Sequence, residues 1–213
     1  MDFLDSKIQD YADNHTSHES SVLKELSDET SANVPAPQML SGHIQGRILS
    51  MMSKMIKPKY ILEIGTYTGY SAICMCEGLQ EGGKLVTIDI NTDMEAINKK
   101  YFDKAGVSGK IEKLVGNALE LIPTLDHKWD MVFIDADKTN YANYYDMIFD
   151  NVNKGGVIIA DNVLWSGRVL DDEKDMDDDT KALKNFSKKI MDDDRVENIL
   201  FPVRDGLMVI VKK

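Results

Sequence analysis

The sequence predicts an α/β fold whose mostly parallel sheet ends in an antiparallel hairpin. From residue 60 onward, five short apolar runs alternate with helical patterns, which is typical of parallel strands joined by right-handed crossovers. The runs are almost continuously apolar, as expected when helices cover both faces of a sheet. Two further runs flank Arg204-Asp205-Gly206, which indicates a hairpin with Asp205-Gly206 at its turn. The length of 213 residues suits one such domain with an extra terminal segment.

Two helical regions precede the first strand. Residues 2–33 have the pattern of one or two polar amphipathic helices, which end at the linker NVPAPQM because proline cannot continue a helix. Residues 39–57 show a second helical pattern, which ends at Pro58. We therefore divide the chain into an N-terminal helical segment, residues 1–38, and a main domain, residues 39–213.

The alternating pattern assigns the later elements in order. The expected parallel strands are residues 60–64, 84–89, 111–115, 131–135 and 156–161. The helices expected between them are residues 69–80, 92–104, 118–123 and 140–150. An acidic loop then leads to a helix at 178–192 and to the two hairpin strands, 198–203 and 207–213.

The composition argues against several classes of protein. The chain has 36 acidic and 25 basic residues, a formal net charge of -11, so it has no general attraction for nucleic acid or anionic membranes. Binding of RNA through a local basic patch stays open. No apolar run of 18 residues and no leader pattern occurs, so we expect neither a transmembrane helix nor a signal peptide. Cys74 and Cys76 are expected to be buried thiols, and a reducing, cytoplasmic location fits them.

Acidic residues gather at the carboxyl ends of the expected strands, the edge where open α/β sheets bind ligands. Four of the parallel strands end in an acid, and the third ends in a glycine turn; these positions are Glu63, Asp89, Gly116, Asp135 and Asp161. A carboxylate in such a place is costly without a partner. Unrelated caps and turns are the structural alternative, but four acids on one edge favour a binding site.

The first strand runs into a glycine turn with the pattern Glu63-x-Gly65-x-x-x-Gly69. A dinucleotide site would carry G-x-G-x-x-G, whereas here the middle glycine is missing and an acid lies beside the turn. Asp89 lies 20 residues beyond Gly69, where a carboxylate can accept both ribose hydroxyls. A nucleoside that carries positive charge and no phosphate, such as S-adenosylmethionine (SAM), fits both features.

A second polar group follows the fourth and fifth strands. Asp135, Asp161 and Asn162 offer three hard oxygen ligands, which suit Mg²⁺, Mn²⁺ or Ca²⁺ better than zinc. Lys138 lies three residues beyond Asp135. Beside a metal and partly out of water, a lysine loses its proton more readily and can act as a base. A surface lysine that caps the next helix is the structural alternative.

Six motifs run from about residue 39 to the end of the chain: ILEIGTYTGYSA, VTIDIN, VGNALELIPTL, WDMVFIDADKTNY, GGVIIADNVLWSG and RDGLMVIVKK. In this order the sequence resembles the cation-dependent O-methyltransferases, the family of the catechol and caffeoyl-coenzyme A enzymes and their bacterial relatives. The pairing of FIDADK with ADNVLW is the most specific part of the resemblance. The family fold implies a Rossmann-like, doubly wound, seven-stranded sheet with helices on both faces and an antiparallel C-terminal hairpin.

The resemblance also implies roles for single residues. Those expected to bind SAM are Ser41, Glu63, Gly65, Thr66, Ser71, Asp89, Ala118, Asp135 and Asp137. Those expected to bind a divalent cation, Mg²⁺ above all, are Asp135, Asp161 and Asn162. Lys138 falls on the family's proposed base, and members of the family are often homodimers.

We therefore expect a SAM-dependent, metal-dependent O-methyltransferase that acts on one of two vicinal hydroxyls of a small aromatic acceptor, catechol-like or hydroxycinnamoyl-type. A metal would hold the two oxygens while Lys138 removes a proton. Ser166 stands where plant enzymes carry a substrate-contacting asparagine, and residues 1–38 match no substrate-recognition pattern of the family. The alternatives are a tRNA hydroxyuridine O-methyltransferase, a non-catalytic cofactor-binding protein and a nucleotide-binding oxidoreductase.

Overall fold

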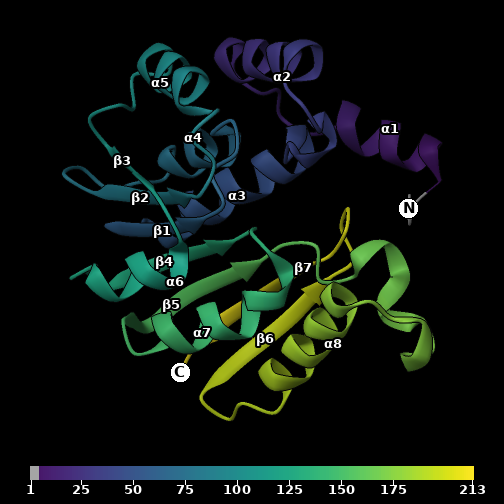
Figure 1. The fold of residues 1–213 in the computed structure, drawn as a ribbon. Coiled ribbons are helices and arrows are strands. Elements are labelled where there is room, and N and C mark those ends of the chain that lie inside the picture. The colour runs from purple at the N-terminus through teal and green to yellow at the C-terminus, as the bar shows by residue number, and fades with distance from the viewer. Residues whose placement is uncertain (1–4) are drawn as a thin grey trace.

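The structure, a computed structural model, describes residues 5–213 and contains a seven-stranded sheet (Figure 1). Its strands are β1 (Tyr60–Ile64), β2 (Lys84–Asp89), β3 (Ile111–Val115), β4 (Trp129–Ile134), β5 (Val152–Ala160), β6 (Val196–Phe201) and β7 (Leu207–Lys212). They lie in the order β3-β2-β1-β4-β5-β7-β6. The fold class predicted from the sequence is confirmed.

The order and direction of the strands define where the sheet can bind a ligand. Strands β1 to β5 pair in parallel, and β7 pairs antiparallel with both β5 and β6. Strand β7 follows β6 in the chain but lies inside the sheet, between β5 and β6. The strand order reverses between β1 and β4, and α/β sheets of this kind bind ligands at such a switch point.

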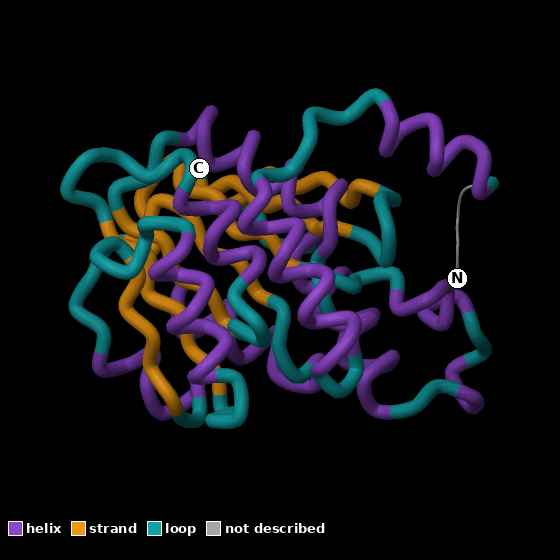
Figure 2. The backbone as a smooth tube through the Cα atoms, turned by 90° about the horizontal axis from the view of Figure 1, so that it is seen from above, coloured by secondary structure: helices purple, strands orange, loops and turns teal. Residues whose placement is uncertain are grey.

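Helices cover both faces of the sheet, as Figures 1 and 2 show. The helices are α1 (Ser6–Asn14), α2 (Ser21–Asn33), α3 (Gly42–Ile56), α4 (Tyr70–Cys76), α5 (Glu95–Lys104), α6 (Ala118–Leu121), α7 (Tyr141–Phe149) and α8 (Asp178–Met191). Helices α2 to α5 bury apolar side chains against one face, and α6 to α8 against the other. The result is a three-layer α/β/α domain.

The alternation of side chains along β1 explains how one strand serves both layers. Ile61 packs toward α2 to α5, whereas Leu62 and Ile64 pack toward α6 to α8, and all three are fully or almost fully buried. Because successive residues of a strand point to opposite faces, Glu63 shares the face of Ile61. An acidic side chain is thus inserted into an apolar layer directly below α4.

Several boundaries differ from those predicted. Helix α4 ends at Cys76 instead of residue 80. A Cβ on Gly78 would lie 2.1 Å from the Ser53 carbonyl carbon, so the chain leaves the helix where it meets α3. Strand β5 begins at Val152, four residues earlier than expected. The hairpin turn spans residues 202–206, with Gly206 at a positive φ of 89°.

The first helix lies at the periphery of the molecule in both views (Figures 1 and 2). Helix α1 has no buried residue. The segment is held near α3 by His43, whose ring nitrogens lie 2.8 Å from the Ser17 carbonyl oxygen and 3.3 Å from Asp13 Oδ1. Helix α2, by contrast, contributes Leu23 and Leu26 to the core, both fully buried.

Both cysteines are free and buried, as predicted. Burial raises the pKa of Cys74 and of Cys76 to about 12, so neither thiol ionises readily near neutral pH. None of the helices among residues 5–213 is long and apolar enough to cross a membrane.

Candidate functional site

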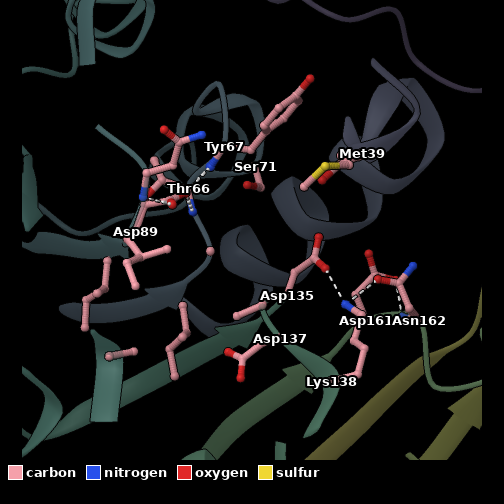
Figure 3. A pocket seen from close by; sticks show the side chains of 18 of the residues that line it. Met39, Thr66, Tyr67, Ser71, Asp89, Asp135, Asp137, Lys138, Asp161 and Asn162 are labelled. Carbon is pink, nitrogen blue, oxygen red and sulfur yellow. Dashed lines mark hydrogen bonds and ion pairs between the residues drawn. The ribbon is translucent and has the colours of Figure 1, made fainter. Parts of the chain in front are cut away.

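A cavity of about 940 Å³ lies at the carboxyl ends of the parallel strands, at the switch point. Of the residues singled out from the sequence, those that line it are Ser41, Gly65, Thr66, Ser71, Asp89, Ala118, Asp135, Asp137, Lys138, Asp161 and Asn162. Figure 3 shows two groups among them, one around Asp89 and one around Lys138. We call residues 65–71 with Asp89 and Ala118 the nucleoside end, and Asp135, Lys138, Asp161 and Asn162 the oxygen end.

The glycine turn allows the two ends to approach each other. Gly65 has a φ of 100°, a conformation that other residues rarely adopt. A Cβ there would lie 1.9 Å from the carbonyl oxygen of Asp135. Gly69 has a φ of 88° and is the N-cap of α4. Gly65 therefore lets the turn after β1 lie against the backbone that follows β4, and Gly69 lets the chain enter α4.

Asp89 binds the glycine turn through its backbone. Its Oδ2 accepts hydrogen bonds from the N–H groups of Thr66, at 3.0 Å, and Tyr67, at 2.7 Å. Its Oδ1 accepts a third from the N–H of Asn91, at 2.8 Å. The carboxylate is thereby fixed at the end of β2, where it lines the cavity and keeps about one acceptor position for a ligand.

Glu63 lies behind the cavity wall and does not line it. Its side chain is fully buried and accepts hydrogen bonds from Ser71 Oγ and Thr87 Oγ1, each at 2.5 Å. Burial raises the pKa of Glu63 to about 8, and the nearby charges of Asp135 and Asp89 act in the same direction. Ser71 lines the cavity, so Glu63 reaches a ligand through Ser71 rather than by direct contact.

Three further predicted residues occupy different walls. Ser41 precedes α3, and its carbonyl oxygen accepts a hydrogen bond from the guanidinium of Arg204. Ala118 begins α6, where the chain turns after β3. Asp137 accepts hydrogen bonds from Tyr144 and from the side chain of Asn140. The fold thus collects segments separated by up to about 160 residues around one cavity.

The oxygen end is organised around the amine of Lys138. Its Nζ donates to Asp135 Oδ1 at 2.9 Å and to Asn162 Oδ1 at 2.8 Å. The third donor position goes to Tyr141 Oη at 2.7 Å, which in turn donates to the carbonyl oxygen of Asp161 at 3.1 Å. The lysine is only 8% exposed, so it is not the surface lysine of the structural alternative.

Asp161 is the most buried acid of this group, with 4% of its surface exposed. Burial raises its pKa to about 7, and repulsion from Asp135 adds to the shift. Its Oδ2 accepts from Gln45 Nε2 at 2.6 Å, and its Oδ1 from the N–H of Asn162 at 2.7 Å. Asn162, at a φ of 59°, also donates from Nδ2 to Asp205 Oδ2 at 3.4 Å.

The oxygen end has the groups to bind a cation, because the Asp135 carboxylate and the Asn162 amide oxygen meet at the Lys138 ammonium and a second carboxylate, Asp161, lies beside Asn162. Asp135, Asp161 and Asn162 supply the hard oxygen ligands that Mg²⁺, Mn²⁺ and Ca²⁺ prefer. Within residues 5–213, no set of three His, Cys, Asp or Glu side chains comes together as a metal site. The candidate ligand set therefore depends on the Asn162 amide as its third member.

Several residues that shape the site carry no clear signal in the sequence. Gln45 reaches Asp161 across 116 residues, and Arg204 reaches Leu40 and Ser41 from the hairpin turn. Tyr141 follows Lys138 by three residues, a helical spacing that could have drawn attention to it. Trp165 lines the cavity, and its indole N–H is buried without a hydrogen-bond partner.

Comparisons with known proteins agree with this geometry. A family model described as O-methyltransferase matches residues 13–213. Caffeoyl-CoA O-methyltransferase 5 of Nicotiana tabacum is 37% identical over 196 residues, 87% of this chain and 81% of that protein. Probable caffeoyl-CoA O-methyltransferase 1 of Dictyostelium discoideum is 31% identical over 212 residues, 97% of this chain and 92% of that protein.

Solved structures match over the whole described fold. An SAH-bound methyltransferase of Podospora anserina superimposes with a TM-score of 0.89 at 30% identity, covering 98% of this chain and 94% of that one. An O-methyltransferase of Bacillus cereus in complex with SAH gives a TM-score of 0.88 at 28% identity, covering 97% of each chain. The similarity includes the strands whose ends form the cavity.

Proposed function

This chain belongs to the O-methyltransferase family, and from that premise we propose that it methylates one of two vicinal hydroxyls on a small aromatic acceptor. We propose SAM as the methyl donor and a divalent cation, Mg²⁺ above all, as a further requirement. The observation that carries the proposal is the single cavity in which the nucleoside end and the oxygen end face each other (Figure 3).

The nucleoside end supports SAM as the donor. Two structural relatives hold SAH, which is SAM without its transferred methyl group. In this chain the carboxylate of Asp89 keeps an acceptor position for a ribose hydroxyl, and Gly65 lines the cavity without a side chain. Ser71, held by Glu63, would contact the methionine part, near the negative charges of Asp135 and Asp137.

The oxygen end fits a divalent cation. A positive charge is already stabilised there, because the ammonium of Lys138 bonds to both Asp135 and Asn162. The side chains that would hold the cation are Asp135, Asp161 and Asn162. When bound, SAM supplies a methyl group on a positively charged sulfur, and the cation supplies Lewis acidity toward two neighbouring acceptor oxygens.

Lys138 is the proposed general base. Its amine lies within hydrogen-bond distance of two proposed cation ligands, so it would be close to an acceptor hydroxyl held there. Tyr141 keeps the amine in place, and burial holds the pKa of Tyr141 well above its ordinary value, so its hydroxyl stays neutral. The buried walls around Lys138 exclude most water from the proton transfer.

The cavity that residues 5–213 form offers a phosphate no unpartnered basic side chain, so we favour a free catechol-like acceptor over a phosphate-bearing one. The acids that line it are Asp89, Asp135, Asp137, Asp161 and Asp179. Both lining cations have partners, because Lys138 binds the oxygen end and Arg204 binds the carbonyls of Leu40 and Ser41. The coenzyme A part of a hydroxycinnamoyl thioester, like tRNA, would bring several phosphate charges to this surface.

The N-terminal segment, residues 1–38, is proposed to affect acceptor choice more than cofactor binding, with residues 39–213 as the methyltransferase domain. Gln38 lines the cavity, so the segment reaches the space where an acceptor would lie. A homodimer is also part of the proposal, and exposed Met51 and Met55 on α3 support it. A cytoplasmic location stays a prediction.

The test is a methylation assay with labelled SAM and three acceptor classes: free catechols, hydroxycinnamoyl thioesters and undermodified tRNA. We expect methylation of free catechols that chelator abolishes and Mg²⁺ or Mn²⁺ restores, while SAM binding measured by calorimetry persists in chelator. Asp161→Ala and Asn162→Ala should behave like the chelated enzyme. Full activity in excess chelator would refute the metal proposal, and a strong preference for thioesters or tRNA would refute the acceptor proposal.

A further inference from the structure

We propose that Gln45 is a positioning residue for the oxygen end: its side-chain amide orients Asp161 so that the carboxylate can bind a cation. The inference rests on the proposed function, because it concerns the proposed metal ligand Asp161. Gln45 does not line the cavity, so its effect would pass through Asp161 alone.

The hydrogen bond between Gln45 and Asp161 is buried and fixes the orientation of the carboxylate. Gln45 is 1% exposed, and its Nε2 lies 2.6 Å from Asp161 Oδ2. The other carboxylate oxygen, Oδ1, accepts from the N–H of Asn162 at 2.7 Å. Each oxygen thus has one donor, which fixes the plane of the carboxylate and leaves the remaining lone pairs for a ligand.

Helix α3 carries Gln45 as a rigid support. A Cβ on the next residue, Gly46, would lie 2.5 Å from the Tyr70 ring and 2.9 Å from Cys74 Sγ, so only glycine lets α3 approach α4 this closely. This close packing at Gly46 fixes the backbone of α3 beside Gln45, so its side chain can reach Asp161 in one conformation.

The neutrality of the donor is the chemical reason for a glutamine here. A buried lysine or arginine at this position would satisfy Asp161 but would also cancel its charge and repel a cation. An amide supplies the hydrogen bond and leaves the negative charge available. Removal of such a support from a metal ligand typically lowers metal affinity by about 10–100-fold.

The test compares Mn²⁺ binding to the full chain, measured by electron paramagnetic resonance titration, for wild type and three variants. Gln45→Met keeps the side-chain volume but removes the donor, and Gln45→Glu replaces the donor by an acceptor. Ser53→Ala is the matched control, because it removes a buried hydrogen bond from the same helix far from Asp161. Calorimetry with SAM and thermal unfolding are measured for each protein.

We expect about 10–100-fold weaker Mn²⁺ binding in Gln45→Met, a larger loss in Gln45→Glu, and SAM affinity within about twofold of wild type. Ser53→Ala should lower thermal stability yet keep Mn²⁺ affinity. Wild-type Mn²⁺ affinity in Gln45→Met, or an equal loss in Ser53→Ala, overturns the inference alone. If Gln45→Met does not fold, the same criteria apply to Gln45→Glu, and failure of both to fold assigns Gln45 a purely structural role. A wild-type protein that binds no Mn²⁺ overturns the metal proposal together with this inference.

Discussion

The nucleoside end and the oxygen end share one cavity but are built in opposite ways. At the nucleoside end, one short stretch of chain and the neighbouring strand end suffice, and Asp89 binds backbone N–H groups there. At the oxygen end, side chains bind one another from α3, from the segments that follow β4 and β5, and from the hairpin turn. Backbone bonds tolerate changes of side chain, so we expect substitutions to have larger and more specific effects at the oxygen end.

The largest effect should come from Lys138→Ala. If this amine is the general base, methyl transfer should slow by about 10²–10⁴-fold while SAM affinity persists. The defect should shrink as pH rises, because the acceptor hydroxyl then ionises without help. Single-turnover rates with labelled SAM measure this, with Lys189→Ala, which breaks a surface ion pair with Asp146, as control. A full rate in Lys138→Ala would show that another group takes the proton.

Gly65→Ala should disturb both ends together. The added Cβ would meet the Asp135 carbonyl oxygen at 1.9 Å, at a φ of 100°. Gly82→Ala is the control, because it has a φ of +69° and nothing lies within 4 Å of the position that its added methyl group would take. Gly82→Ala should lower the free energy of unfolding by about 1–3 kcal/mol from backbone strain alone. Urea unfolding should show a clearly larger decrease for Gly65→Ala. Equal decreases in the two variants would mean that the backbones after β1 and β4 can move apart without loss of stability.

Asp89→Ala should weaken SAM binding by about 1–3 kcal/mol, the range for hydrogen bonds to a charged group. The metal affinity of the oxygen end should stay unchanged, which would show that the two ends bind their ligands independently. Calorimetry with SAM and Mn²⁺ titration check the two parts, with the nearby exposed Asp93→Ala as control. Tight binding of NAD in place of SAM by the wild-type protein would contradict the assignment of this end.

The smallest effect, counted per pH unit, concerns the pH dependence of stability. Burial raises the pKa of Glu63 from 4.5 to about 8, so between these values the folded chain holds a proton that the unfolded chain has released. This contribution is fully present below the unfolded value and is lost as pH rises toward the folded one, by at most about 1.4 kcal/mol per pH unit. Urea unfolding across this range should show the slope in wild type and a flatter profile in Glu63→Gln. If wild type and Glu63→Gln showed the same dependence of unfolding free energy on pH, Glu63 would be ionised in the folded protein.

The contrast between the two ends also explains how much could be predicted from the sequence. The parallel strands, the hairpin and the acids at the strand ends follow from local patterns, so the fold and most of the acids that line the cavity were predictable. Glu63 was placed on the correct strand, but alternation along β1 turns it behind the wall, where it bonds to Ser71. The contacts of Gln45 and Asp205 at the oxygen end could not be predicted, because their partners lie 116 and 43 residues away in the sequence and no local spacing indicates those contacts.

Strand β7 has a consequence for how the protein is made. Because β7 lies between β5 and β6 yet is the last of the three to be synthesised, β6 has no neighbour in the sheet until β7 has emerged from the ribosome. Until then the edge of β5 is open, and the turn that carries Asp205 has not reached Asn162. A nascent chain therefore holds an exposed strand edge that can pair with other chains. Cleavage after Phe201 would recreate this state in the finished protein, so loss of the hairpin should lead to aggregation as well as to an incomplete oxygen end.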